Sequence, residues 1–131
     1  MTCKSIYDLS LSLLGEDISG DFSKDYESRA PHLIAAFCSI EAENDALYRK
    51  HFGLEAQSIN LSGKPSLNLD EVFPLSDIFF TACGYYLASS LIFDSDLDRS
   101  ISLFEKYKEN IKAVFSSIPF ENSKILDIYK N

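Results

Sequence analysis

Residues 54–74 read LEAQSINLSGKPSLNLDEVFP, and this stretch separates two pairs of helix-like segments. Within it Gly63-Lys64-Pro65 is a strong turn signal, and the residues on both sides alternate between polar and apolar. This alternation is the period of a half-exposed strand, so the stretch predicts a small β-hairpin or an ordered loop. A structureless connection of this length is uncommon in a compact domain and usually has a function.

The segments around this stretch carry apolar residues at helical spacing. They cover, approximately, residues 4–14, 23–52, 76–93 and 96–118. The third is apolar on most sides, as expected of a central helix or of one in a subunit contact. Gly15 and Gly53 are the expected helix ends, and Pro31 predicts either a kink or a new helix start. The predicted fold is therefore mainly α: a bundle of about four helices with a small hairpin or ordered loop between the second and third.

Apolar stripes run along the second and fourth segments. In the second, Ile40 falls on the stripe and Glu41 among the charged residues of the other side. In the fourth, one face carries Leu97, Ile101, Phe104, Tyr107, Ile111, Val114 and Ile118. Stripes of this kind at helical spacing usually form the core.

Length and charge limit the classes of protein to consider. A chain of 131 residues predicts a single domain over residues 1–131. Its formal net charge of -8 makes a poor phosphate-binding surface, so sequence-specific nucleic-acid binding is not expected. No signal-peptide pattern opens the sequence, and the longest apolar-rich segment, residues 78–93, is too short to span a bilayer. We therefore expect no membrane partner.

Cysteine usage favours a reducing compartment. Cys3, Cys38 and Cys83 are widely spaced, with no pairing or zinc pattern. Cys38 and Cys83 lie in apolar helical stretches, where a free thiol packs as a small hydrophobe and is inert. No nucleophile–base pair or ligand spacing stands elsewhere in the sequence. We therefore predict no catalytic, cofactor-binding or metal site, and a protein that is not an enzyme.

One acidic motif keeps an alternative open. Acidic residues at 94, 96, 98 and 105 occupy the first, third, fifth and twelfth places of a calcium loop. Arg99, however, holds the sixth place, where a left-handed turn normally needs glycine. The simpler interpretation is that Asp residues cap the fourth helix. The alternative function is a soluble helical regulatory or protein-binding module with weak calcium binding at Asp94–Glu105.

Beyond Pro119 the sequence predicts a C-terminal arm, residues 120–131. Phe120 lies outside the helical stripes, and aromatic residues in such places favour contacts with proteins. The run Ile125–Tyr129 is short, partly alternating and strand-like. Its backbone groups are of the kind that a neighbour's sheet edge can satisfy.

The order of these patterns resembles that of one known family. An apolar helix with Tyr85-Tyr86-Leu87-Ala88 follows the run Leu67–Leu75, and the long second helix opens with Ser28-Arg29-Ala30-Pro31. The apolar helix is followed by the Asp-rich turn Asp94–Asp98, a helix with Phe104-Glu105-Lys106-Tyr107, and the closing Ile125–Tyr129. This layout resembles the small head–tail connector (adaptor) proteins of tailed bacteriophages, which are often found in bacterial prophages.

The resemblance implies a structural virion protein that assembles as a ring between the portal and the tail. Its partners would be copies of itself and portal or tail-completion proteins, with no small-molecule substrate. It would occupy the cytoplasm of the bacterial host and then the virion. The hairpin and the arm would be the contact elements. The predicted contact residues are Ile59, Leu61, Leu67, Leu69, Phe120, Ile125, Leu126, Ile128 and Tyr129.

Overall fold

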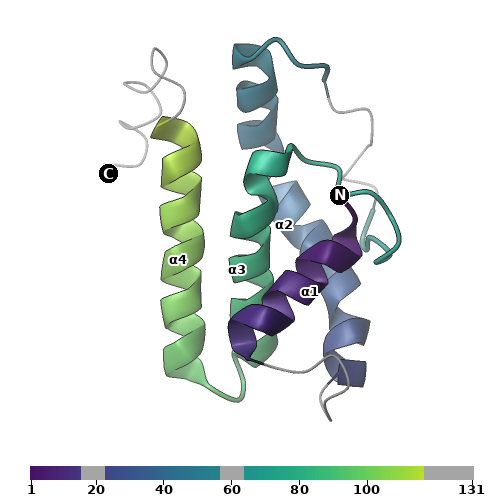
Figure 1. Ribbon diagram of the computed structural model, residues 1–131, viewed down its shortest axis with the longest axis vertical. Helices are drawn as coiled ribbons and strands as arrows, with labels where there is room; N and C mark the ends of the chain where they lie inside the picture. The colour runs from purple at the N-terminus through teal and green to yellow at the C-terminus, as the bar shows by residue number, and fades with distance from the viewer. Residues whose placement is uncertain (16–22, 57–63, 117–131) are drawn as a thin grey trace.

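The computed structural model describes residues 1–15, 23–56 and 64–116 (Figure 1). These ranges contain α1 (Cys3–Leu14), α2 (Ser23–His51), the short 3-10 helix η2 (Asp77–Phe79), α3 (Phe80–Ile92) and α4 (Leu97–Ser116). Helix α3 is central, because it packs against α1, α2 and α4. The prediction of a mainly α bundle of four main helices is confirmed.

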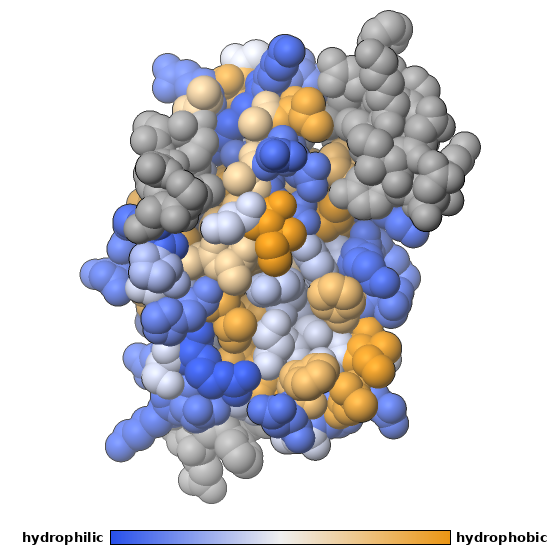
Figure 2. All heavy atoms as spheres, turned by 180° about the vertical axis from the view of Figure 1, so that it is seen from behind, coloured by the Kyte–Doolittle hydropathy of each residue, from blue (hydrophilic) through white to orange (hydrophobic). Residues whose placement is uncertain are grey.

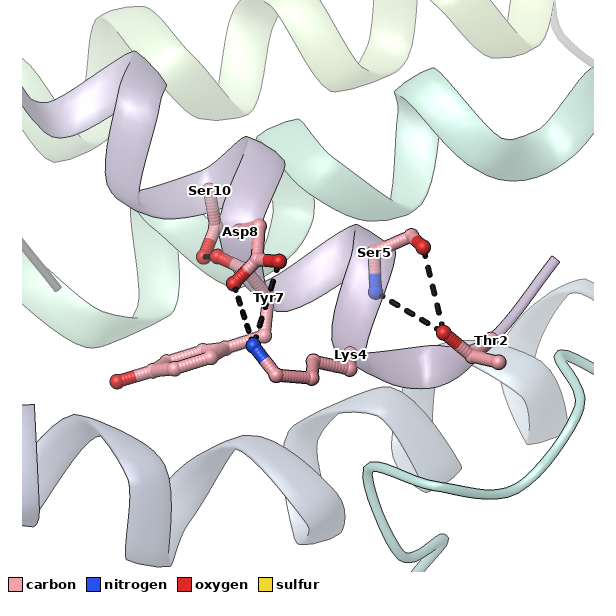
Figure 3. A network of polar contacts seen from close by, with 6 residues as sticks. All are labelled: Thr2, Lys4, Ser5, Tyr7, Asp8 and Ser10. Carbon is pink, nitrogen blue, oxygen red and sulfur yellow. Dashed lines mark hydrogen bonds and ion pairs between the residues drawn. The ribbon is translucent and has the colours of Figure 1, made fainter.

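The ends of α1 follow from local chemistry. Thr2 caps its start, since the Thr2 side-chain oxygen accepts a hydrogen bond from the Ser5 amide (3.4 Å; Figure 3). On the exposed side Lys4 reaches Asp8 one turn later, with 3.4 Å between Nζ and Oδ1. Gly15 ends the helix with a φ of 71°, a left-handed conformation that glycine adopts without steric cost. The predicted stop at Gly15 is confirmed.

Helix α2 is continuous through Pro31, so the interpretation of a helix ending there and a new one starting is wrong. The Pro31 carbonyl also accepts a hydrogen bond from the Leu67 amide (3.0 Å), which fixes the later chain against α2. At the other end Gly53 has a φ of 67°, and the Leu54 amide donates to the Arg49 carbonyl (2.8 Å). Gly53 therefore ends α2 as predicted.

Residues 64–74 form a loop that lies against the start of α1. Among residues 54–56 and 64–74 no strand forms, apart from one isolated bridge between Thr2 and Val72. The Cys3 amide donates to the Glu71 carbonyl (2.9 Å), and the Lys4 amide donates to the Leu69 carbonyl (2.7 Å). The first amides of a helix have no partner inside it, so this loop supplies the missing acceptors. Residues 64–74 thus form an ordered loop, and residues 57–63, which a hairpin would also need, lie outside the described residues.

Helices α1 and α3 approach closely at Gly84. A Cβ atom built on Gly84 would lie 2.6 Å from Leu9 Cδ2, well inside van der Waals contact. The core around this crossing includes Ile6, Leu87 and Phe79, all with 0% exposure. Only glycine leaves room for Leu9 where it now packs, so Gly84 sets the distance between the two helices.

Candidate functional site

Helices α2 and α4 flank α3, and two adjoining hollows lie along the side of α4 that faces α2. The larger, of about 550 Å³, is lined by Arg29, Tyr86, Ser89, Ser90, Phe93, Asp94, Ser100, Ile101 and Phe104. The smaller, of about 260 Å³, is lined by Glu41, Phe104, Tyr107, Lys108, Ile111, Lys112 and Phe115. Phe104 borders both, so they form one groove, here called the α2/α4 groove.

Exposed apolar side chains concentrate beside the larger hollow. Phe93 is 58% exposed, and along the first half of α4 Leu97, Ile101 and Phe104 are 51%, 52% and 40% exposed. Figure 2 shows the face opposite to that of Figure 1, where hydrophobic side chains gather at the lower right. Isolated exposed apolar residues are normal, but a cluster beside a hollow indicates an interaction surface.

The floor of the groove is closed by a reciprocal pair of serines. Ser89 Oγ donates to the Ser100 carbonyl and Ser100 Oγ to the Ser89 carbonyl, both at 2.8 Å. Both residues are buried, at 5% and 3% exposure. The small side chains let α3 and α4 approach closely, and their hydroxyls are engaged with the backbone. They hold the two helices together, which is a structural role.

Arg29 closes the end of the groove near the last turn of α3. Its Nη2 donates to the Ser90 carbonyl (3.0 Å) and its Nη1 to the Leu91 carbonyl (3.2 Å). The last carbonyls of a helix have no intrahelical partner and carry partial negative charge. The Arg29 guanidinium satisfies two of them and ties α2 to α3.

In the smaller hollow a buried carboxylate joins α2 to α4. Glu41 is 4% exposed; its Oε1 accepts from the Tyr107 hydroxyl (2.7 Å) and its Oε2 from Asn44 Nδ2 (2.6 Å). The expectation that Glu41 lies on the charged side of α2 is therefore wrong. The helix turns so that Glu41 faces the core one turn after Phe37, while Ile40 is 57% exposed.

A second buried carboxylate fixes both ends of the 54–74 stretch. Asp45 is 1% exposed; its Oδ2 accepts from Arg49 Nε (2.8 Å) and its Oδ1 from the Ser76 amide (2.9 Å). Arg49 also donates to the carbonyls of Glu55 (3.0 Å) and Pro74 (3.2 Å). A buried charge is tolerated when it is paired and hydrogen-bonded, as here. This cluster is a structural clamp outside the groove.

Of the predicted contact residues, the structure describes Leu67 and Leu69. Leu67 is 0% exposed and belongs to the core, because its amide is tied to α2; it is not available to a partner. Leu69 is partly buried against the core. The others lie outside the described residues: Ile59, Leu61, Phe120, Ile125, Leu126, Ile128 and Tyr129.

The thiols are buried, as the sequence predicted for Cys38 and Cys83. All three cysteines have 0% exposure. Burial raises the pKa of Cys3 to about 11, and it also raises the pKa of Cys38 and of Cys83 above the ordinary value. The thiolate is the nucleophilic form, so these protonated thiols are poor nucleophiles at neutral pH.

The acidic motif does not form a calcium loop. Helix α4 begins at Leu97, so most of the twelve positions are helical. Asp96 Oδ1 accepts from the Arg99 amide (3.1 Å), which is the capping interaction that the simpler interpretation predicted. Glu105 pairs with Lys108 at 3.1 Å. Within residues 1–15, 23–56 and 64–116 no three His, Cys, Asp or Glu side chains converge as metal ligands would.

The exposed half of α4 is the feature that sequence reasoning missed, because stripes at helical spacing usually form the core.

The described helices include none with the length and apolar character needed to cross a bilayer. Compared with protein-family models, with curated proteins and with solved structures, the chain matches none.

Proposed function

We propose that this chain is a non-enzymatic structural protein that works by binding other proteins, as the head–tail connectors of tailed bacteriophages do. The observation that carries the proposal is the exposed apolar half of α4. Leu97, Ile101 and Phe104 of α4, together with Phe93 at the end of α3, are 40–58% exposed beside a hollow of about 550 Å³. Apolar and aromatic side chains of this kind form the centre of protein–protein interfaces.

The polar groups of the groove support binding over chemistry. Ser89 and Ser100 hydrogen-bond each other's carbonyls, Arg29 donates to the end of α3, and Glu41 accepts from Tyr107 and Asn44. Each is engaged in holding helices together. A partner would therefore meet a preformed, mainly apolar surface and would need few polar groups at its centre.

The finer assignment comes from the resemblance in sequence layout. It makes the partners copies of this chain in a ring together with portal or tail-completion proteins. The location is then the cytoplasm of the bacterial host and later the virion. The described loop residues 64–74 are engaged with α1 and α2, so the proposal moves the main contact surface from this stretch to the α2/α4 groove.

Reconstitution with a portal tests the proposal. A portal gene is sought beside the gene of this chain, the two proteins are co-expressed, and purified portal rings are imaged by electron microscopy. We expect a ring of additional density on the tail-facing side. Bare portal rings in the presence of folded wild-type chain would contradict the connector assignment.

A matched pair of variants identifies the surface. Ile101→Asp with Phe104→Asp puts two charges into the groove and should abolish the added density. Ser102→Asp changes an exposed residue of the same helix that does not line the groove, so its density should match the wild type. Equal density for both variants would mean that the groove is not the contact.

A further inference from the structure

The groove lies next to the point where the chain continues beyond α4. Phe115 and Lys112, in the last turns of α4, line the smaller hollow, and residues 117–131 follow directly. We propose that the segment Ile125–Tyr129 of the same chain occupies the α2/α4 groove and covers its exposed apolar residues. The inference uses the groove of the proposed function but does not depend on which partner that function requires.

The length of the connecting chain suits this occupant. Nine residues lead from Ser116 to Ile125 and span at most about 30 Å when extended. Along α4 the distance from Ser116 back to Ile101 is about 22 Å at ~1.5 Å per residue. By these lengths, Ile125–Tyr129 can reach the larger hollow, beside Ile101 and Phe93.

The chemistry of the tail also matches that of the groove. Four of the five residues of Ile125–Tyr129 are apolar, in line with the apolar residues that flank the larger hollow. Nearer to α4, Glu121 would pass the smaller hollow, where Lys112 supplies positive charge beside the Lys108–Glu105 pair. Glu121 would thus lie near Lys112, and the apolar tail would contact the apolar residues of the larger hollow.

Covalent connection favours the chain's own tail over other occupants. A short linker holds the tail near the groove at an effective concentration on the order of millimolar. A second copy or a foreign partner, free in solution at micromolar concentration, competes at a disadvantage. The tail would then act as an internal competitor that a partner has to displace.

Disulfide trapping in the full-length protein tests the contact. The variant Ile101→Cys with Ile128→Cys places one thiol in the groove and one in the tail. The native thiols are buried, so they should stay silent under mild oxidation. The control Ser102→Cys with Ile128→Cys puts the first thiol one position along α4 and outside the groove. We expect the groove pair to form an intrachain disulfide at least tenfold faster than the control.

Each other outcome overturns the proposal. Equal rates for the two pairs would mean that the tail does not settle in the groove. A disulfide-linked dimer as the main product would make a second copy the occupant. Should circular dichroism show that Ile101→Cys unfolds the protein, Phe93→Cys with Ile128→Cys repeats the test at another exposed position of the groove. None of these experiments contains a portal, so their failure is separate from failure of the connector assignment.

A non-covalent readout completes the test. The full-length variant Ile125→Asp with Ile128→Asp should uncover the groove and raise the fluorescence of an added apolar dye several-fold. The same two substitutions combined with Ile101→Asp and Phe104→Asp should lose that gain, since the dye site itself is removed. An unchanged signal in the first variant would contradict docking of the tail.

Discussion

The two halves of α4 carry the same apolar stripe and meet different surroundings. In the second half Tyr107, Ile111 and Val114 are 6%, 6% and 3% exposed, whereas Leu97 and Ile101 in the first half are 51% and 52% exposed. A stripe in the sequence shows which face of a helix is apolar, but not what covers that face.

The cause of the difference lies in the neighbouring helices. Around Tyr107 the rings of Phe37 from α2 and Tyr86 from α3 pack at centroid distances of 5.8 Å and 5.4 Å. In the first half of α4, the contact with α3 is made by the small side chains of Ser89 and Ser100, and the larger hollow opens beside them. The buried half is therefore expected to stabilise the fold, and the exposed half to bind.

The largest expected effect is on the buried half. Tyr107→Ala should lower the free energy of unfolding by about 3–5 kcal/mol, because it removes a buried aromatic ring and leaves Glu41 without one donor. Urea denaturation followed by circular dichroism measures it. Tyr107→Phe keeps the ring and should lose only about 1–3 kcal/mol. A loss below ~1 kcal/mol for Tyr107→Ala would remove the contrast between the halves.

The next effect concerns the serine pair that joins α3 to the exposed half. Ser100→Val adds volume at a close helix contact and removes the hydrogen bond from Ser100 Oγ to the Ser89 carbonyl, so we expect a loss of about 1–3 kcal/mol by the same denaturation. Ser100→Ala is the milder control, with about 1 kcal/mol lost. If Ser100→Val matched the wild type, close packing at this point would not hold the lower part of α4.

Helix ends and segments could be predicted because their signals are local. Gly15 and Gly53 stop their helices through backbone conformation alone, and no distant residue is needed. Ile40 and Glu41 show the limit of this reasoning. Both positions follow Phe37 at helical spacing, three and four residues later, so the period alone does not choose between them. The Tyr107 hydroxyl, donated from α4, gives the buried Glu41 carboxylate a partner that the sequence of α2 does not reveal.

The hydrogen bonds of the arginine side chains could not be predicted from the sequence for another reason. Arg29, Arg49 and Arg99 each donate to backbone carbonyls of another part of the chain, including those of Ser90, Pro74 and Leu13. Every residue has a carbonyl, so no residue type marks the acceptor.

The exposure of Leu67 was also predicted wrongly. Its alternating surroundings are typical of a half-exposed strand, but its amide donates to the Pro31 carbonyl and its side chain is buried.

A smaller effect on stability is expected in the exposed half. Phe104→Ala should cost at most about 1 kcal/mol, since a 40% exposed ring gains less from burial than a core ring. The same substitution should weaken partner binding at least tenfold in a titration with the reconstituted portal. Loss of stability equal to that of Tyr107→Ala would show that both halves of the stripe belong to one core.

Thiol chemistry gives the finest comparison, because it reports accessibility one residue at a time. In a wild-type protein alkylated at pH 8, Cys3, Cys38 and Cys83 should stay unmodified, since burial raises their pKa values and blocks the reagent. The contribution of the protonated Cys3 thiol to the free energy of unfolding should be fully present below pH 9 and should decline as the pH approaches 11. The reason is that the Cys3 thiol loses its proton at lower pH in the unfolded chain than in the folded one. Val114→Cys should share this protection. Ile101→Cys should react faster than Val114→Cys, because only the displaceable tail proposed above shields position 101, whereas the core shields position 114. Mass spectrometry of the alkylated chain measures all of these sites at once, and equal protection at 101 and 114 would mean that the first half of α4 is as fully covered as the second.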